Sequence, residues 1–528
     1  MKAPAVVLCA LLFWSGCSKC GANGPGGAAS RSSGLLELLP QGSVLFVVND
    51  LGAFGQKLKR LEQLKVLSFV AQTQGFGSTE ELFTAAFGAL GVDPRSDKAM
   101  REAGIAPERG MGAVVDDAEH SFVVLGVEDA GKLTAFVESQ ARNRRGASVR
   151  TTQAENGLSV VTFARPQETR PQLGLVILGK YAILGGLMDA RGLRAAAGLR
   201  PESSAARAPA LVAALKRLPT QRDLFAFVPQ AVSKFGNLAA PVTASVVLDA
   251  SGLNVQADLP AAVTGDLSWL KGVSSSPRLL RLLPDDAFVR IRFDGSPARA
   301  FPAWQKLVGP RLEALVRDAG IDVQKDLLDN LRPGGVASLS LSPTASVGAG
   351  LPALDVRQTN PFQYVQLVGL GELLRPEPWD QLLEKLTAAG PALGMTVKRA
   401  SVDGTPSFHT SYARGEGVSL SRVKNLALIA APASRLESTL RQVSAAVPAP
   451  SRGTELPPGP LALRVDFLKL ADEVRALPPE AWGVGGFAIR AAAVRWLDVL
   501  SDVKSLDVSA APLEDALEVN VALQVTTP

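Results

Sequence analysis

Two leucine-rich stretches mark the pattern of apolar positions along the chain. LLELLP begins at Leu35 and LLRLLP begins at Leu279. Each is followed by a short apolar run, an aspartate and apolar residues at helical spacing, so the pattern predicts a strand and then a helix after both copies. The spacing of the copies is far longer than the period of solenoid repeats, and it predicts a duplicated domain.

The pattern that follows predicts the same order of elements in both halves. Expected in the first half are strands at 44–48, 114–115, 122–125, 158–163, 243–248 and 255–259, helices at 51–67, 79–90 and 129–141, and a hairpin at 173–184. Expected in the second are strands at 288–293, 337–341, 364–368, 505–511 and 517–523, helices at 297–319 and 376–389, and a hairpin at 418–431. Hairpins and adjacent strands favour an α+β fold of two homologous modules, each a mostly antiparallel sheet with helices packed on a face.

Changes of composition set the expected domain boundaries. They are a signal peptide at 1–16, a flexible tether at 17–34, module 1 at 35–260, a linker at 261–277 and module 2 at 278–528. The linker is placed at a run of glycine, serine and proline.

The N-terminus has the pattern of a targeting segment. Lys2 precedes an uncharged, mostly apolar run at 3–14, which is too short to span a bilayer as a helix. Ser15 and Gly16 then precede Cys17, and this resembles a bacterial lipobox, although Trp14 stands where leucine is preferred. The resemblance implies cleavage before Cys17 and acylation of its thiol. An ordinary secretory signal is the alternative.

Two or three acyl chains would hold the protein stably on a membrane, whereas one chain binds marginally. The residue after Cys17 is Ser18 rather than the aspartate that retains many lipoproteins at the inner membrane. The resemblance therefore favours the outer membrane over the inner one. Cys20 is the one cysteine left beyond Cys17 in the mature chain, so no internal disulfide is expected, and an idle tether thiol or pairing with another chain stays open.

Composition and charge argue against nucleic acid as a partner. The 528 residues are 47% apolar and 20% charged, which is typical of a globular protein, and the net charge is +5. The densest basic cluster, at 142–150, has no interleaved aromatic residues for base stacking.

Candidate catalytic chemistry is sparse. His120 and His409 are the only histidines, which excludes a multi-histidine metal site by count, and no G-x-S-x-G accompanies either. Residues 126–133 resemble a phosphate-binding loop, but Leu133 stands where a hydroxyl must reach Mg²⁺, so a helix capped by Asp129 is expected instead. His120 lies beside acidic residues without the spacing of a calcium loop, which favours a hairpin turn. We expect no enzyme activity, no cofactor and no metal.

The order of motifs resembles a family of bacterial envelope proteins that is known as a domain of unknown function, including duplicated lipoproteins of myxobacteria. The resemblance rests on a Leu-Pro pair, an apolar strand, an aspartate, a long helix and the sequence LGVDP at 90–94. The second half departs from it at 320–323, which lack the proline. The resemblance implies an envelope location and assigns no functional residues.

The sequence thus predicts a non-enzymatic, membrane-anchored lipoprotein of the cell envelope, with Cys17 as its lipidation site, that acts as an interaction module for an envelope protein. The alternative is a periplasmic carrier of a lipid or another hydrophobic ligand, which needs a cavity. Leucine stripes such as that at 51–67 are more typical of a core between helix and sheet. A hydrolase would need one histidine to meet a serine and a carboxylate.

Overall fold

The computed structural model of the chain describes residues 32–526 except 88–90, 117–119, 156, 231–237, 250, 265–266, 271–275, 302–316, 318–319, 343–363, 413–414, 445–455 and 483–485. The chain divides into two compact units. Unit 1 is the described part of Met1–Gly265 together with that of Leu513–Pro528, and unit 2 is that of Asp266–Pro512. The first boundary lies inside the expected linker at 261–277.

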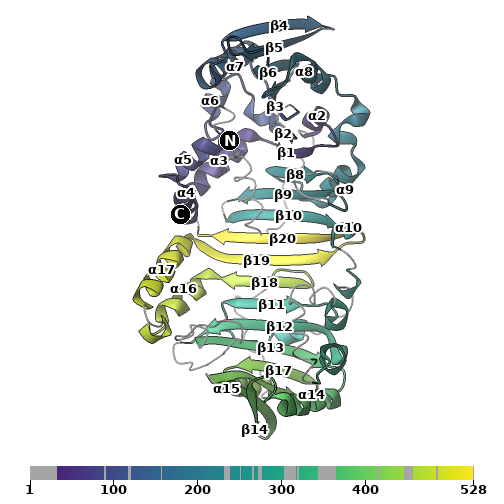
Figure 1. Ribbon diagram of the computed structural model, residues 1–528, viewed down its shortest axis with the longest axis vertical. Helices are drawn as coiled ribbons and strands as arrows, with labels where there is room; N and C mark the ends of the chain where they lie inside the picture. The colour runs from purple at the N-terminus through teal and green to yellow at the C-terminus, as the bar shows by residue number, and fades with distance from the viewer. Residues whose placement is uncertain are drawn as a thin grey trace. The chain divides into compact units, whose positions relative to one another are not determined.

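Unit 1 is built on an antiparallel sheet with the strand order β4-β5-β6-β7-β3-β2-β1-β8-β9-β10-β20 (Figure 1). Its strands are β1 (Val44–Val48), β2 (Met111–Val115), β3 (Phe122–Gly126), β4 (Val149–Glu155), β5 (Leu158–Ala164), β6 (Pro171–Leu178), β7 (Tyr181–Gly185), β8 (Leu224–Val228), β9 (Val242–Asp249), β10 (Gly252–Pro260) and β20 (Ala516–Val525).

Unit 2 has the antiparallel strand order β14-β15-β16-β17-β13-β12-β11-β18-β19. Its strands are β11 (Val289–Phe293), β12 (Leu331–Leu341), β13 (Val365–Leu373), β14 (Met395–Val402), β15 (Thr405–Tyr412), β16 (Gly415–Val423), β17 (Leu426–Ala431), β18 (Leu461–Asp466) and β19 (Val503–Pro512). This order is the same as that of the first nine strands in the unit 1 order, from β4 to β9. Each strand of unit 2 corresponds to the unit 1 strand whose number is lower by ten, so that β14 corresponds to β4 and β19 to β9. The expected α+β class with antiparallel sheets is confirmed.

The C-terminal strand β20 corrects the expected end of module 2. The sequence placed everything from 278 to 528 in one module, but β20 belongs to unit 1. It pairs with the whole length of β10, from Gly252 opposite Gln524 to Pro260 opposite Ala516. Leu523 packs beside Leu253 on the core of unit 1. Backbone pairing and apolar burial together hold β20 there.

Helices pack on the unit 1 sheet as expected, and they cover both of its faces. One face carries α3 (Leu51–Leu61), α5 (Thr79–Phe87) and α7 (Ala130–Arg145), and the other carries α2 (Ser32–Leu36), α8 (Ala190–Ala197) and α9 (Pro209–Arg217). This explains why β1 reads as a continuous apolar run: Val48 packs into the first face, while Leu45 and Val47 pack into the second.

The expected helix at 51–67 is two helices. Asp50 caps α3 by accepting a hydrogen bond from the backbone N–H of Ala53 over 2.8 Å. The helix ends at Leu61, and α4 (Lys65–Thr73) starts after Leu64. Both stretches keep apolar residues at helical spacing, so periodicity alone did not reveal the break between them.

Helices also lie on both faces of the unit 2 sheet. One core cluster joins α11 (Ser276–Leu280) and α15 (Ala433–Ser444), and the other contains α14 (Pro376–Ala389). The leucine-rich stretches have equivalent places: Leu35 and Leu39 are fully buried in unit 1, as Leu279 and Leu283 are in unit 2. Most of the expected helix at 297–319 lies outside the described residues.

Unit 2 has two further helices, α16 (Phe467–Ala476) and α17 (Gly486–Val499). They belong to the segment of the chain that connects β18 to β19. In the part of the chain that the structure describes, no helix has the length and apolar character needed to cross a membrane.

Candidate functional site

A hollow of about 750 Å³ opens in unit 1 beside the ends of its central strands. It lies where β1 begins, β2 ends and β3 begins, and α8 covers one side of it. Its apolar lining residues are Pro40, Val114, Phe122, Pro171, Leu187, Met188, Ala195, Ala196 and Leu199, and its polar ones are Ser43, Asp116, His120, Thr169, Arg170, Asp189 and Arg191. An apolar floor with a charged rim suits a ligand that has both characters.

The floor of the hollow is continuous with the core. Val114, Phe122 and Met188 are buried members of the cluster beneath α8. Met188 can pack there because residue 185 is a glycine: a Cβ on Gly185 would stand 2.6 Å from the Met188 sulfur. These side chains are fixed by packing, so the hollow is part of the folded scaffold.

The backbone at the hollow adopts a strained conformation. Leu187, a lining residue, has a φ of 63°, a region that costs a side chain with a Cβ about 1–2 kcal/mol. Strain of this kind persists where the surrounding structure imposes it, often at functional sites. Here it brings the chain from β7 into α8, whose first turn Asp189 caps by accepting a hydrogen bond from the Gly192 N–H over 2.7 Å.

The rim carries charges of both signs. Asp116 and His120 come from the β2–β3 connection, and the backbone N–H of Asp116 donates to the Ser121 hydroxyl over 2.8 Å. Arg170 precedes β6, and Arg191 lies in the first turn of α8. Within the described residues, Arg191 makes no ion pair and no hydrogen bond. Its guanidinium can therefore serve an acidic group of a ligand.

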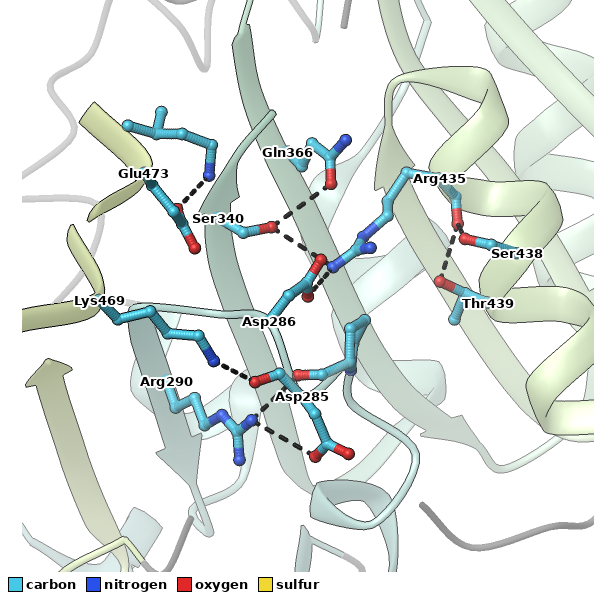
Figure 2. A network of polar contacts seen from close by, with 12 residues as sticks. Asp285, Asp286, Arg290, Ser340, Gln366, Arg435, Ser438, Thr439, Lys469 and Glu473 are labelled. Carbon is cyan, nitrogen blue, oxygen red and sulfur yellow. Dashed lines mark hydrogen bonds and ion pairs between the residues drawn. The ribbon is translucent and has the colours of Figure 1, made fainter. Parts of the chain in front are cut away.

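A polar network occupies the equivalent place in unit 2 (Figure 2). Phe122 pairs with Gly185 in unit 1, and Leu367 pairs with Ala431 in unit 2. Asp189 follows Gly185 by the same number of residues by which Arg435 follows Ala431. The guanidinium of Arg435 thus stands where unit 1 has the start of α8 and the hollow beside it.

Arg435 links three elements of unit 2. It is mostly buried and pairs with Asp286, which lies just before β11. It also donates a hydrogen bond to the hydroxyl of Ser340 in β12 over 3.3 Å. The Ser340 hydroxyl in turn donates to the Gln366 side chain in β13 over 3.4 Å. The Arg435 Nε has no partner among the described residues.

Basic residues hold the neighbouring turn at 284–286. Lys469 donates to the backbone carbonyl of Asp285, and Arg290 donates to that of Pro284 over 3.0 Å (Figure 2). Burial lowers the pKa of Arg290, and the nearby Asp285 and Asp286 carboxylates oppose this change.

Glu473 of α16 is the strongly perturbed acid of this region. Its carboxylate accepts a hydrogen bond from the backbone N–H of Leu341, at the end of β12, over 2.6 Å. Burial raises the pKa of Glu473 to about 7, and the charge of Asp286 adds to the rise. The Leu341 N–H, Lys469 and Arg435 act in the opposite direction. The carboxyl therefore titrates near neutral pH.

His409 lies between two serines on the sheet of unit 2. Its Nδ1 is 2.8 Å from the Ser419 hydroxyl, and its Nε2 is 3.1 Å from the Ser407 hydroxyl. Both serines are buried. A Ser-His-Asp triad needs a carboxylate on the second ring nitrogen, and here a second hydroxyl takes that position.

The segment that resembles a phosphate loop is a helix start. Asp129 caps α7 by accepting a hydrogen bond from the Lys132 N–H over 2.9 Å, which confirms the expected cap. This backbone hydrogen bond lowers the pKa of Asp129. Glu128 forms an ion pair with Arg101 at 2.7 Å. The turn therefore presents carboxylates at the place where the phosphates of a nucleotide would need hydrogen-bond donors.

Of the residues that the sequence singled out, His120 lines the hollow, whereas His409 and Asp129 lie outside it. Cys17 and Cys20 lie outside the described residues, and so do 117–119 beside His120. Within the described chain, no group of three or more His, Cys, Asp or Glu side chains is arranged to hold a metal ion. Sequence reasoning missed the hollow, Arg435 and Glu473, because each depends on segments that are distant in the sequence.

Comparison with known proteins does not assign the chain to a family. No family model matches it, and no curated protein matches it. A solved structure titled "Structure of crystal form I of TP0453" matches over 47% of this chain and 92% of its own, with 12% identity and a TM-score of 0.21.

Proposed function

We propose that this protein is a non-enzymatic lipoprotein of the cell envelope that binds a small amphipathic ligand in the hollow of unit 1. The hollow itself is the observation that supports this. Its volume of about 750 Å³ is within the range of about 300–1,000 Å³ that is usual for small-ligand sites. The proposal selects the carrier alternative over the interaction module.

The lining suggests how a ligand would be oriented. Phe122 and Met188 present an apolar surface that would exclude water from a hydrocarbon part. Arg191 and Arg170 stand at the rim, where an acidic group would remain partly solvated. Arginine binds carboxylates and phosphates through paired N–H groups. A single-chain amphiphile with an acidic head is therefore the ligand class we propose.

The envelope location is part of the same proposal. Acylation of Cys17 would anchor the protein on a membrane, with the outer membrane favoured, and residues 18–34 would let the folded body swing clear of the lipid. A lipid-anchored protein with a site for a single-chain amphiphile would hold such molecules in the periplasm.

Native mass spectrometry of the protein purified from its own envelope tests the proposal. We expect a stoichiometric adduct of the mass of a small amphiphile, and acylation of Cys17. Titration with dodecanoic acid, dodecylamine and dodecanol then tests the head group, and the acid should bind most tightly because of Arg191 and Arg170.

A pair of matched variants connects binding to the hollow. Ala195 is an exposed residue of α8 that lines the hollow, and Ala213 is an exposed residue of α9 outside it. Ala195→Trp should abolish binding of dodecanoic acid, whereas Ala213→Trp should leave it unchanged. A bare mass together with a tightly co-purifying envelope protein would overturn the ligand proposal in favour of the interaction module.

A further inference from the structure

The connection between the last two strands of unit 2 is longer than the corresponding connection in unit 1. In unit 1 the chain passes from β8 to β9 through residues 229–241, whereas in unit 2 it passes from β18 to β19 through residues 467–502. The longer connection holds α16 and α17, which contact each other. Figure 1 shows both helices beside the ends of the unit 2 strands.

This helix pair carries an unusual share of exposed apolar side chains. Of the six large apolar residues that are exposed in the described chain, three lie here: Leu468 at 44%, Ile489 at 54% and Trp496 at 54%. Ile489 and Trp496 are seven residues apart on α17, so they lie on the same side of the helix two turns apart. Ala492, between them, is also exposed.

Basic residues flank the exposed apolar stripe that Ile489, Ala492 and Trp496 form on α17. Arg490 and Arg495 have no ion pair and no hydrogen bond within the described residues. The nearby acid, Asp498, is already paired with Arg475 at 3.2 Å. The stripe on α17 therefore combines a tryptophan and an isoleucine with two available guanidinium groups.

We propose that α17 docks on an anionic membrane surface. Tryptophan favours the boundary between headgroups and acyl chains, and arginine favours lipid phosphates. The exposed apolar surface consists of a few side chains on one helix, which is small for a stable protein interface. The contact rests on the membrane location proposed above, and it would orient the body relative to the membrane in addition to the lipid anchor.

Vesicle binding by the chain without its lipid tests the inference separately from lipidation. The chain from Ser18 onward, which lacks both the apolar run at 3–14 and the acylated Cys17, is sedimented with vesicles of phosphatidylglycerol and phosphatidylethanolamine or of phosphatidylcholine. We expect binding to the anionic vesicles that weakens with salt. Ile489→Ser with Trp496→Ser should reduce it about tenfold or more, and so should Arg490→Gln with Arg495→Gln.

Matched variants elsewhere serve as controls. Leu374→Ser changes an exposed leucine of unit 2, and Arg281→Gln with Arg200→Gln changes two exposed arginines. These variants should bind vesicles like the parent. Equal binding by the α17 variants and the parent, or no binding by the parent, would overturn the inference. Concentration-dependent self-association that the α17 variants abolish would also overturn it, because the stripe would then be a protein interface.

A spectroscopic readout places the helix at the surface directly. Brominated lipids in the vesicles should quench the fluorescence of Trp496, and Trp496→Phe should lose this part of the quenching. The loss of the native Cys17 lipid would be detected separately by mass, so a failed anchor and a failed docking surface give different results.

Discussion

The carboxylate of Glu473 lies 2.6 Å from the backbone nitrogen of Leu341, across a sequence separation of 132 residues. The contact joins α16 to the end of β12. It holds an acid whose pKa burial raises to about 7, next to Asp286, Arg435 and Lys469. Protonation at neutral pH therefore changes a contact between a helix and a strand.

The raised pKa predicts how stability depends on pH. Between pH 4.5 and about 7 the folded state keeps the Glu473 proton that the unfolded state releases, so this group stabilises the fold at low pH and the benefit is lost as pH rises through this window. The shift corresponds to at most about 3 kcal/mol, and because the carboxyl is half exposed we expect about 1 kcal/mol.

Chemical denaturation at pH 5 and pH 8 measures this contribution. Glu473→Gln keeps an acceptor for the Leu341 N–H but cannot titrate, so it should reduce the pH dependence by about 1 kcal/mol. Glu437→Gln, which changes a more exposed acid on α15, serves as the control. An unchanged pH dependence in Glu473→Gln would contradict the assignment.

Docking of β20 onto β10 makes a prediction for Gly252. Its φ is 150°, and a Cβ there would stand 1.8 Å from the Leu523 carbonyl oxygen. Gly252→Ala should destabilise unit 1 by about 3 kcal/mol, because strain and a clash with backbone add together. Gly157, with a φ of 77° and no atoms near its Cβ position, gives the control. Gly157→Ala should cost about 1 kcal/mol. Equal losses in urea denaturation would show that β20 does not pack there.

The ion pair of Arg217 and Asp258 joins α9 to β10. A guanidinium nitrogen of Arg217 lies 2.5 Å from a carboxylate oxygen of Asp258, and the Asp258 side chain is 5% exposed. Arg217→Ala should lower the free energy of unfolding by about 3 kcal/mol, because it leaves the buried Asp258 carboxylate without its partner. Arg217→Met with Asp258→Asn should cost less, since no charge remains. Arg142→Ala, in an exposed pair on α7, should change the denaturation midpoint little. A smaller loss in Arg217→Ala than in the double variant would contradict this interpretation.

The equivalent leucines of the two units should behave alike. Leu39 and Leu283 are buried beneath their sheets. Truncation of either leucine to alanine should lower the free energy of unfolding of its unit by about 3 kcal/mol, because apolar burial is lost and a cavity remains. Leu38 and Leu282 are half-buried neighbours, and the same truncation there should cost about 1 kcal/mol. Hydrogen exchange resolved by peptide assigns each loss to its unit, and a large loss at Leu39 alone would show that the two places are not equivalent.

Much of the local structure could be predicted from the sequence. The run at 44–48 is strand β1, and the helix expected at 376–389 is α14 with the same bounds. These elements have strong periodicity and clear start signals, so nearby residues suffice to specify them. The break after Leu61 was missed, because the apolar spacing continues through it.

The candidate site could not be predicted in the same way. The hollow combines Pro40, Phe122, Arg170 and Met188, which only the sheet brings together. Arg435 and Glu473 have no local motif that sets them apart from other charged residues on helices. Their special character comes from burial and from partners that are more than ninety residues away in the sequence.

The sequence by itself determined the antiparallel α+β class and the place of strands such as β1, and it predicts a repeated order of strand, aspartate and helix and, from its lipobox-like start, a membrane anchor. These depend on short-range periodicity and on residue types in fixed order. The tertiary structure decided that helices cover both faces of each sheet, that β20 belongs to unit 1, and that the place of the hollow in unit 1 holds an arginine network in unit 2. Those outcomes depend on contacts between distant segments, because backbone pairing and burial select partners by shape and charge, which a local pattern does not record.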